Sequence, residues 1–321
     1  MEALRTAGII LGLAGILLIS ALRFGLKRLR NIDWLIGSGL SLILLLLGLF
    51  PDLFNAFLGF FSFEEGSGQR LIGLLFFSNM ALYLLVYVAL SRSNQVERLI
   101  DRLVRELAKR EFRKIQDPDE APIYVIIPAY NEAENIGAVL EEVPKAVFGL
   151  KTKILVVVDG ATDETEAIVR QLDNEAISHV INRGGGAALK AGYEIAVECG
   201  AEIVVTLDAD GQHLPEEIPQ LVRPILDGEA DLVNGSRVLG HYEKDNQLRA
   251  AGVVLFNWLV SVLTLTRITD CSNAFRAIRA EELSKLELNQ RQFHTTELLI
   301  DGLKKGLRVE EVPITIRRRL S

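Results

Sequence analysis

Long apolar runs dominate the first ninety residues of the chain. They cover residues 7–22, 34–50 and 71–90, and each has 16 to 20 residues without a charged side chain. As helices they would extend for about 24–30 Å, which matches the hydrocarbon core of a bilayer. Three such runs are hard to bury in a soluble domain of this size, so the pattern predicts three transmembrane helices.

Basic residues flank these runs unevenly. Residues 23–30 contain four Arg or Lys, the loop after the second run carries Glu64 and Glu65, and Arg92 and Arg98 follow the third run. Basic residues favour the cytoplasmic side, so we expect the N-terminus outside and the rest of the chain in the cytoplasm. A cleaved signal peptide is the alternative for the first run, but the basic cluster follows that run instead of preceding it.

An amphipathic segment comes next, at residues 94–114. Val96, Ile100, Leu103 and Leu107 recur at spacings of four, three and four, which marks one face of a helix. The repeat is too short to establish a coiled coil. The pattern therefore predicts a linker helix that rests on the membrane or on the domain that follows.

From residue 123 onward, short β-branched runs alternate with helical patterns. The predicted strands cover residues 123–128, 153–159, 178–182, 202–208 and 230–236. The predicted helices lie near 134–146, 163–173, 187–198 and 215–227. Strands without polar alternation are covered on both faces, so this order predicts an α/β fold with a mostly parallel sheet. We expect a transmembrane domain at 1–92, a linker helix at 93–117 and an α/β domain at 118–321.

Polar segments follow the predicted strands, at the end where such sheets bind ligands. The segment TLDADGQH sets Asp208 and Asp210 one residue apart. Two neighbouring carboxylates repel each other without a counter-charge, and Asp oxygens suit Mg²⁺ or Mn²⁺, which would bring a diphosphate with it. The alternative is a turn that caps the helix predicted at 215, with His213 either a ligand or a solvated or capping residue.

Composition narrows the classes of function. The formal net charge of −7 argues against a general nucleic-acid-binding surface. Cys199 and Cys271 are far apart without metal-ligand spacing, so we interpret them as reduced structural thiols. The turn RGGG could approach a phosphate closely, but it has neither a Walker lysine nor the GxGxxG spacing.

The motifs occur in a familiar order: IIPAYNEAENI, VVVDGATDET, NRGGGAALKAGY, TLDADGQH, NGSR, DCSNAF and EVPI. This order resembles the inverting family-two glycosyltransferases with a GT-A fold, especially the dolichol-phosphate mannose synthase-like branch, which loads a sugar onto a polyprenyl phosphate. The resemblance covers about residues 123–321. The first ninety residues resemble a small three-helix membrane domain found beside such transferases. The resemblance thus implies a GT-A domain, Rossmann-like and mostly parallel, preceded by an all-α transmembrane domain.

The resemblance also implies roles for individual residues. Those that match the nucleotide pocket are Pro128, Tyr130, Glu132 and Asp159, the last one beside the base. Those that match the metal and diphosphate site, with Mg²⁺ or Mn²⁺, are Asp208, Asp210 and Gln212. Those that match substrate-binding arginines are Arg237 and Arg249, for the acceptor phosphate, and Arg319 after EVPI. Asp210 and Arg237 would be catalytic.

Three positions depart from the family pattern. Val158 replaces the first acid of Asp-Asp-Gly-Ser, Gly185 replaces the lysine of Asn-x-Gly-Lys-Gly, and Ala274 replaces the glycine of Gly-Phe-Arg. Half of the usual acidic pair and the usual loop cation are therefore missing from this chain.

The function that the resemblance implies is inverting transfer of a hexose from a nucleotide-diphosphate sugar to a dolichyl or undecaprenyl phosphate. The enzyme would lie in a cell inner membrane or an ER-type membrane, with its catalytic domain in the cytoplasm. A phosphate monoester is ionised near neutral pH, so the acceptor needs little help from a general base.

Two alternatives stay open: a tethered transferase for a diacylglycerol lipid or a growing glycan, and a silent scaffold that binds a nucleotide sugar. The sequence selects neither the sugar nor the oligomeric state, and a homo-oligomer is compatible with it.

Overall fold

The computed structural model describes residues 2–20, 69–115, 121–172, 174–242, 247–288 and 294–317, residue 290 and short pieces between residues 37 and 50. The chain divides into two units, Met1–Asn94 and Gln95–Ser321. The division falls within the predicted linker. Residues 51–68, which join the second and third apolar runs, lie outside the described residues.

The first unit contains helix α1 (Glu2–Ser20) and the beginning of α4 (Gln69–Ile115). Glycines let α1 approach the segment near residue 41 closely: a Cβ built on Gly15 would lie 2.4 Å from Ser41 Oγ, and one on Gly12 would lie 2.7 Å from Leu45 N. The hydroxyl of Ser41 donates to Gly37 O at 2.9 Å. Within the described ranges, no helix is both long enough and apolar enough to cross a membrane.

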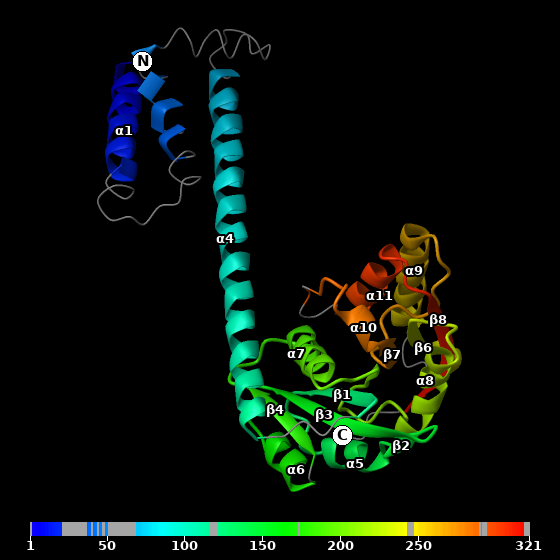
Figure 1. Cartoon of the computed structure of the whole chain (residues 1–321). Helices are drawn as coiled ribbons and strands as arrows, with labels where there is room; N and C mark the ends of the chain where they lie inside the picture. The colour runs from blue at the N-terminus through cyan, green and yellow to red at the C-terminus, as the bar shows by residue number, and fades with distance from the viewer. Residues whose placement is uncertain are drawn as a thin grey trace. The chain divides into compact units, whose positions relative to one another are not determined.

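Helix α4 joins two elements that the sequence separated. The third apolar run and the linker form one continuous helix (Figure 1), because residues 91–93 contain neither glycine nor proline to interrupt it. In the second unit, Val104, Ala108 and Phe112 of this helix are buried against the α/β layers. The predicted apolar face, which includes Leu103, is instead exposed. The linker therefore packs through a different face from the one that the spacing suggested.

The second unit is built on an eight-stranded sheet with the order β2-β3-β1-β5-β7-β6-β8, in which β4 also pairs with β3. The strands are β1 (Ile123–Ala129), β2 (Ala146–Val147), β3 (Leu150–Asp159), β4 (Glu175–His179), β5 (Ile203–Thr206), β6 (Leu232–Tyr242), β7 (Arg276–Arg279) and β8 (Val309–Ile316). Parallel pairs join β1 to β3 and β5, β3 to β4, and β6 to β8, while β7 lies antiparallel between β5 and β6. All strands except β2 and β7 therefore run the same way, and their carboxyl ends share one edge.

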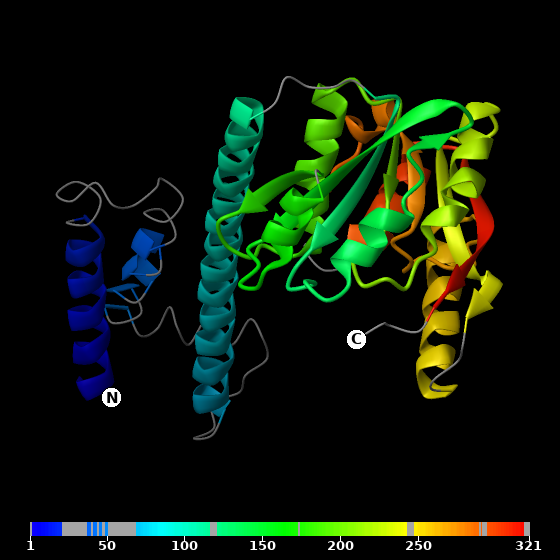
Figure 2. The same cartoon turned by 90° about the horizontal axis from the view of Figure 1, so that it is seen from below.

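Helices cover both faces of this sheet (Figure 1), and Figure 2 shows the strands between them after a turn of 90°. One face carries α5 (Ile136–Glu142), α6 (Thr165–Gln171), the 3₁₀ turn Pro215–Glu217 and α8 (Ile218–Leu226). The other carries α7 (Gly185–Glu198), α9 (Gln247–Thr264), α10 (Ala280–Leu283) and α11 (His294–Lys304). In β1, Val125 and Ile127 enter the first core, whereas Tyr124 and Ile126 enter the second. This two-sided burial explains the continuous apolar run and confirms the predicted α/β class.

The structure differs from the sequence expectation in the bounds of β4 and in three strands that were not predicted, β2, β7 and β8. The strand predicted at 178–182 corresponds to β4, which ends at His179. Val180 and Ile181 are apolar, which suggested a buried strand, but they are 77% and 46% exposed and lie beyond its end. Strand β7 was not predicted because its sequence begins and ends with arginine, although Arg276 is buried. Arginines at both ends are typical of a loop, so only the pairing with neighbouring strands identifies this segment as a strand.

Close packing of α7 on the sheet requires a glycine, which gives a first prediction. A Cβ on Gly192 would lie 2.5 Å from Ile126 Cγ2 and 3.2 Å from Val157 Cγ2. Gly192→Ala should therefore lower the free energy of unfolding by about 1–3 kcal/mol, as overpacked cores do, measured by urea unfolding.

Gly137→Ala on α5 is the matched control, because its Cβ would meet Ile168 Cγ2 only at 3.8 Å. It should be neutral or stabilise the protein by about 0.5–1 kcal/mol through helix propensity. Equal losses for the two variants would contradict the packing argument.

Candidate active site

The loops after β1 and β3 are tied together at the carboxyl edge of the sheet. Asn131 Oδ1 accepts a hydrogen bond from Thr162 N at 2.8 Å, and Glu132 N donates to Thr165 Oγ1 at 2.9 Å. Asn131 has a positive φ of 54°, which turns the chain sharply after Tyr130. Tyr130 is exposed beside this turn. The predicted nucleotide-pocket residues Pro128, Tyr130 and Glu132 thus lie on one short segment, which these hydrogen bonds hold against the loop after β3.

Asp159, at the end of β3, is buried and holds the glycine-rich loop that follows β4. Its carboxylate accepts hydrogen bonds from Gly184 N at 2.6 Å and from Arg183 N at 3.0 Å, and it contacts His179 Nδ1 at 2.7 Å. A carboxylate can only accept, so Nδ1 of His179 carries the proton. This anchoring role was missed in the sequence, and the contact of Asp159 with a base stays a prediction.

Gly160 explains why the next position has no side chain. Its φ is +67°, and a Cβ built on it would lie 2.2 Å from Asn182 N. The loops after β3 and β4 therefore touch through their backbones. Only glycine tolerates both the positive φ and the close backbone contact, so a glycine is required in DGATD where the two loops cross.

The turn after β5 is fixed from within by His213. Asp208 N donates to His213 Nδ1 at 3.2 Å, and His213 Nε2 donates to Asn273 Oδ1 at 2.9 Å. Both ring nitrogens are thus used, and this buried histidine anchors the turn. Neither the 3₁₀ turn at Pro215 nor α8 has a side-chain cap at its N-terminus, which argues against the capping-turn alternative.

Asp208 and Asp210 form the like-charged pair that the sequence predicts. Burial raises the pKa of the Asp208 carboxyl above its ordinary value, and the Asp210 carboxylate also raises it. Asp210 Oδ1 accepts from Gln212 N at 3.1 Å, while Gln212 Nε2 donates to Arg317 O at 3.4 Å. The amide of Gln212 thus ties the turn to the chain after β8.

The donor set suits a hard divalent cation. Across the described ranges, no group of three or more His, Cys, Asp or Glu side chains forms a cation site. Mg²⁺ is commonly held by one or two carboxylates together with substrate phosphates, so the Asp208 and Asp210 oxygens fit such an ion. A positive charge there would also relieve the repulsion between the two carboxylates.

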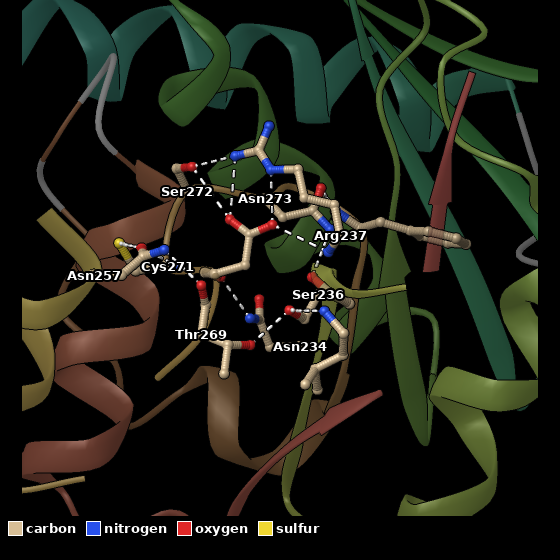
Figure 3. A network of polar contacts seen from close by, with 12 residues as sticks. Asn234, Ser236, Arg237, Asn257, Thr269, Cys271, Ser272 and Asn273 are labelled. Carbon is tan, nitrogen blue, oxygen red and sulfur yellow. Dashed lines mark hydrogen bonds and ion pairs between the residues drawn. The ribbon is translucent and has the colours of Figure 1, made fainter. Parts of the chain in front are cut away.

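Arg237, on β6, forms a two-pronged ion pair with Asp270 (Figure 3). Nε and Nη2 donate to the two carboxylate oxygens at 2.8 and 3.1 Å, and Nη2 also donates to Ser272 Oγ at 2.6 Å. The Asp270 side chain is 0% exposed, whereas that of Arg237 is 25% exposed. Within the described part of the chain Nη1 has no acceptor, so this nitrogen can bind an oxygen of a substrate.

A buried polar network holds Asp270 in turn. Glu311 accepts from Thr269 N at 2.7 Å, from Asp270 N at 3.1 Å and from Asn234 Nδ2 at 2.9 Å. Asn234 Nδ2 also donates to Asp270 O at 2.7 Å. The sequence named no role for Asp270 or Glu311, although both lie in the quoted motifs DCSNAF and EVPI. Their function became visible only as contacts that orient Arg237.

An apolar groove of about 510 Å³ has sequence neighbours of this ion pair among its walls. It is lined mainly by α9 and the segment after it, and its walls include Val238, Val254, Trp258, Val262, Leu265 and Thr269. Val238 follows Arg237 and Thr269 precedes Asp270 in the sequence, whereas Arg237 and Asp270 themselves do not line the groove. Trp258 is 58% exposed, which leaves an apolar face open along α9.

The remaining predicted residues are placed only in part. Arg249 lies on α9 but its side chain is outside the described residues, as is all of Arg319. A residue that the sequence analysis missed, His294, lies against the glycine-rich loop: a Cβ on Gly185 would be 3.1 Å from its Cε1. A side chain at 185 would therefore press on this ring, where the family pattern has a lysine.

Comparison with known proteins places these motifs in a family. Residues 124–286 match the model for glycosyl transferase family 2. The chain is 33% identical over 214 residues to UDP-N-acetylglucosamine–dolichyl-phosphate N-acetylglucosaminyltransferase of Methanococcus voltae, which covers 60% of this chain and 84% of that protein. It is also 33% identical over 218 residues to polyprenol monophosphomannose synthase of Mycolicibacterium smegmatis, covering 61% and 77%.

A solved structure agrees with the sheet described above. Glucosyl-3-phosphoglycerate synthase from Mycobacterium tuberculosis, in complex with Mn²⁺ and UDP-glucose, has a TM-score of 0.51 and 26% identity, covering 62% of this chain and 72% of that one. The mixed sheet is thus of the GT-A type, and the matched residues 124–286 include Asp208, Asp210 and Arg237. With its fold, its motif order and its relatives in agreement, this chain belongs to glycosyltransferase family 2 and is a glycosyltransferase.

Proposed function

We propose that this protein transfers a sugar from a nucleotide-diphosphate sugar to the phosphate of a polyprenyl lipid. The observation that carries the proposal is the Arg237–Asp270 pair, whose sequence neighbours Val238 and Thr269 line an apolar groove. A cation close in sequence to the walls of an apolar groove fits an acceptor with a charged head and an isoprenoid chain. The relatives named for dolichyl phosphate and polyprenol substrates support the same acceptor class.

On the donor side, Asp208 and Asp210 would hold Mg²⁺ or Mn²⁺ together with the diphosphate, next to Gln212. The ion would supply positive charge for the departing diphosphate. Pro128, Tyr130 and Glu132 would bind the nucleotide on the loop after β1, opposite the braced loop after β3. Asp159 would keep the glycine-rich loop in place beside the diphosphate.

On the acceptor side, Arg237 would position the phosphate through Nη1 while Asp270 holds the other two guanidinium nitrogens. The acceptor is already ionised near neutral pH, so no general base is required. One phosphate oxygen attacks the anomeric carbon as the bond to the diphosphate breaks, which inverts the configuration. The protein contributes orientation and charge neutralisation.

The N-terminal part would anchor the enzyme at the lipid. We propose that the runs at 7–22, 34–50 and 71–90 cross a membrane and leave the catalytic domain in the cytoplasm, supported by their lack of charge and by their basic flanks. Such tethering raises the effective concentration of a lipid acceptor and has little use for two soluble substrates.

The metal gives the second prediction. Asp210→Asn keeps the shape of the side chain and removes one charge, so kcat should fall by about two powers of ten or more, measured with a radiolabelled nucleotide sugar. Asp227→Asn, an exposed carboxylate paired with Arg223, is the control and should keep full activity. Undiminished transfer in excess chelator would rule out the metal-dependent reaction.

The acceptor gives the third prediction. Arg237→Lys keeps a positive charge near the buried Asp270 but loses the fork, so the KM for polyprenyl phosphate should rise about ten-fold or more. Nucleotide-sugar binding by calorimetry should stay near the wild-type value. Arg237→Ala should be more severe, since it also leaves Asp270 as an uncompensated buried charge.

Arg223→Lys, at an exposed ion pair on α8, is the control for the third prediction and should change neither constant. Loss of nucleotide-sugar affinity in Arg237→Lys, with an unchanged dependence on acceptor, would assign Arg237 to the donor site instead.

Orientation gives the fourth prediction. A cysteine at Gly66 should react with an impermeant thiol reagent from outside the cell, and a cysteine at Asn31 should not. Background labelling should be low because Cys199 and Cys271 are both buried. The reverse labelling pattern would contradict both the orientation and the use of cytoplasmic nucleotide sugars.

A further inference from the structure

The glycine-rich loop, which comprises residues 182–184 and the first two residues of α7, Gly185 and Gly186, is held from two sides. From the sheet, Asp159 accepts the backbone hydrogen bonds of Arg183 and Gly184. From the other side, Asp101 on α4 forms an ion pair with the Arg183 side chain, Oδ1 to Nε at 2.5 Å. Both side chains are largely buried, at 12% exposure for Arg183 and 18% for Asp101. Asp101 lies outside the residues 124–286 that match the family.

Other ion pairs attach the same stretch of α4 to α7, not to the loop. Lys109 contacts Glu194 at 3.0 Å and Glu198 at 2.6 Å, and Arg113 contacts Glu198 at 2.5 Å. Together with the buried face of α4, these contacts fix the helix along α7. Asp101 is then carried to the loop by a helix whose position is already determined, so its pairing with Arg183 adds a separate restraint.

The loop needs such a restraint because of its composition. Residues 184–186 are three consecutive glycines, and Gly184 has a φ of +90°. Glycine has the largest conformational freedom of any residue, so this backbone loses much entropy when it is ordered. Arg183 is the loop's only long side chain and its only cation, because position 185 is glycine. The Arg183 side chain is therefore the group through which the linker helix can hold the loop in place.

We propose that Asp101 is a positioning residue of the donor site, acting through Arg183 on the glycine-rich loop. The inference rests on the proposed function, in which this loop borders the nucleotide-sugar diphosphate. With the pair intact, the loop is ordered before the donor arrives, and binding does not have to supply that order. The linker helix is thus part of the machinery that sets donor affinity, in addition to joining the two units of the chain.

The fifth prediction tests this role by charge removal and charge exchange in the full-length protein. Asp101→Asn should raise the KM for the nucleotide sugar about five- to ten-fold with little change in kcat. The double variant Asp101→Arg with Arg183→Asp should restore much of the lost affinity. Glu198→Gln, which weakens two ion pairs between α4 and α7 but does not touch the loop, is the matched control and should leave KM unchanged.

Hydrogen exchange gives a readout that does not depend on transfer activity. The amides of Arg183 and Gly184 should exchange faster in Asp101→Asn than in wild type and return towards wild-type rates in the double variant. Unchanged exchange in Asp101→Asn, or the same KM increase in Glu198→Gln, would overturn the inference. Inactive wild-type enzyme with protected loop amides would instead refute the proposed function while leaving the loop restraint intact.

Discussion

The parallel register of β1 with its two neighbours is the constraint on which the donor side of the site depends. Pro128 lies level with Val157 of β3, and Ile126 lies level with Thr206 of β5. Two residues beyond Thr206 along the chain is Asp208, and two beyond Val157 is Asp159. Three loops that are distant in sequence therefore leave the sheet at the same height, and this alignment brings the predicted nucleotide residues near the carboxylate pair.

The acceptor side depends on a different arrangement, in which β7 runs against its neighbours. This strand separates β5 from β6, so the segment before it, which holds Asp270, reaches Arg237 in the middle of β6. A buried carboxylate is costly to desolvate unless it is paired and hydrogen-bonded. Here the guanidinium fork, the Ser272 hydroxyl and the Glu311 network all surround Asp270, which makes a single orientation of Arg237 favourable.

Helix α4 lies outside the family match and α9 lies within it, and both contact motif segments of the predicted site. The last turns of α4 are buried on the α/β unit and reach the glycine-rich loop, although the spacing of apolar residues suggested another face. Beside the charged pair, α9 leaves an apolar surface open. A lipid acceptor would bind with its charged head at Arg237 and its chain along α9.

The sequence alone determined the α/β class, the parallel direction of the predicted strands, the polar segments after β1, β3, β4 and β5 and the like-charged Asp208–Asp210 pair, because periodicity and motif spacing are local properties. Arg237, which was expected after its strand, lies instead within β6, which continues to Tyr242. The predicted roles in binding, the domain boundaries and the membrane topology stay predictions. Only the tertiary structure decided which partners orient these residues. Arg237 and Asp270 are 33 residues apart, His213 and Asn273 are 60 apart, and Arg183 and Asp101 are 82 apart. Contacts at such separations depend on strand order and helix packing, which no local pattern in the chain specifies.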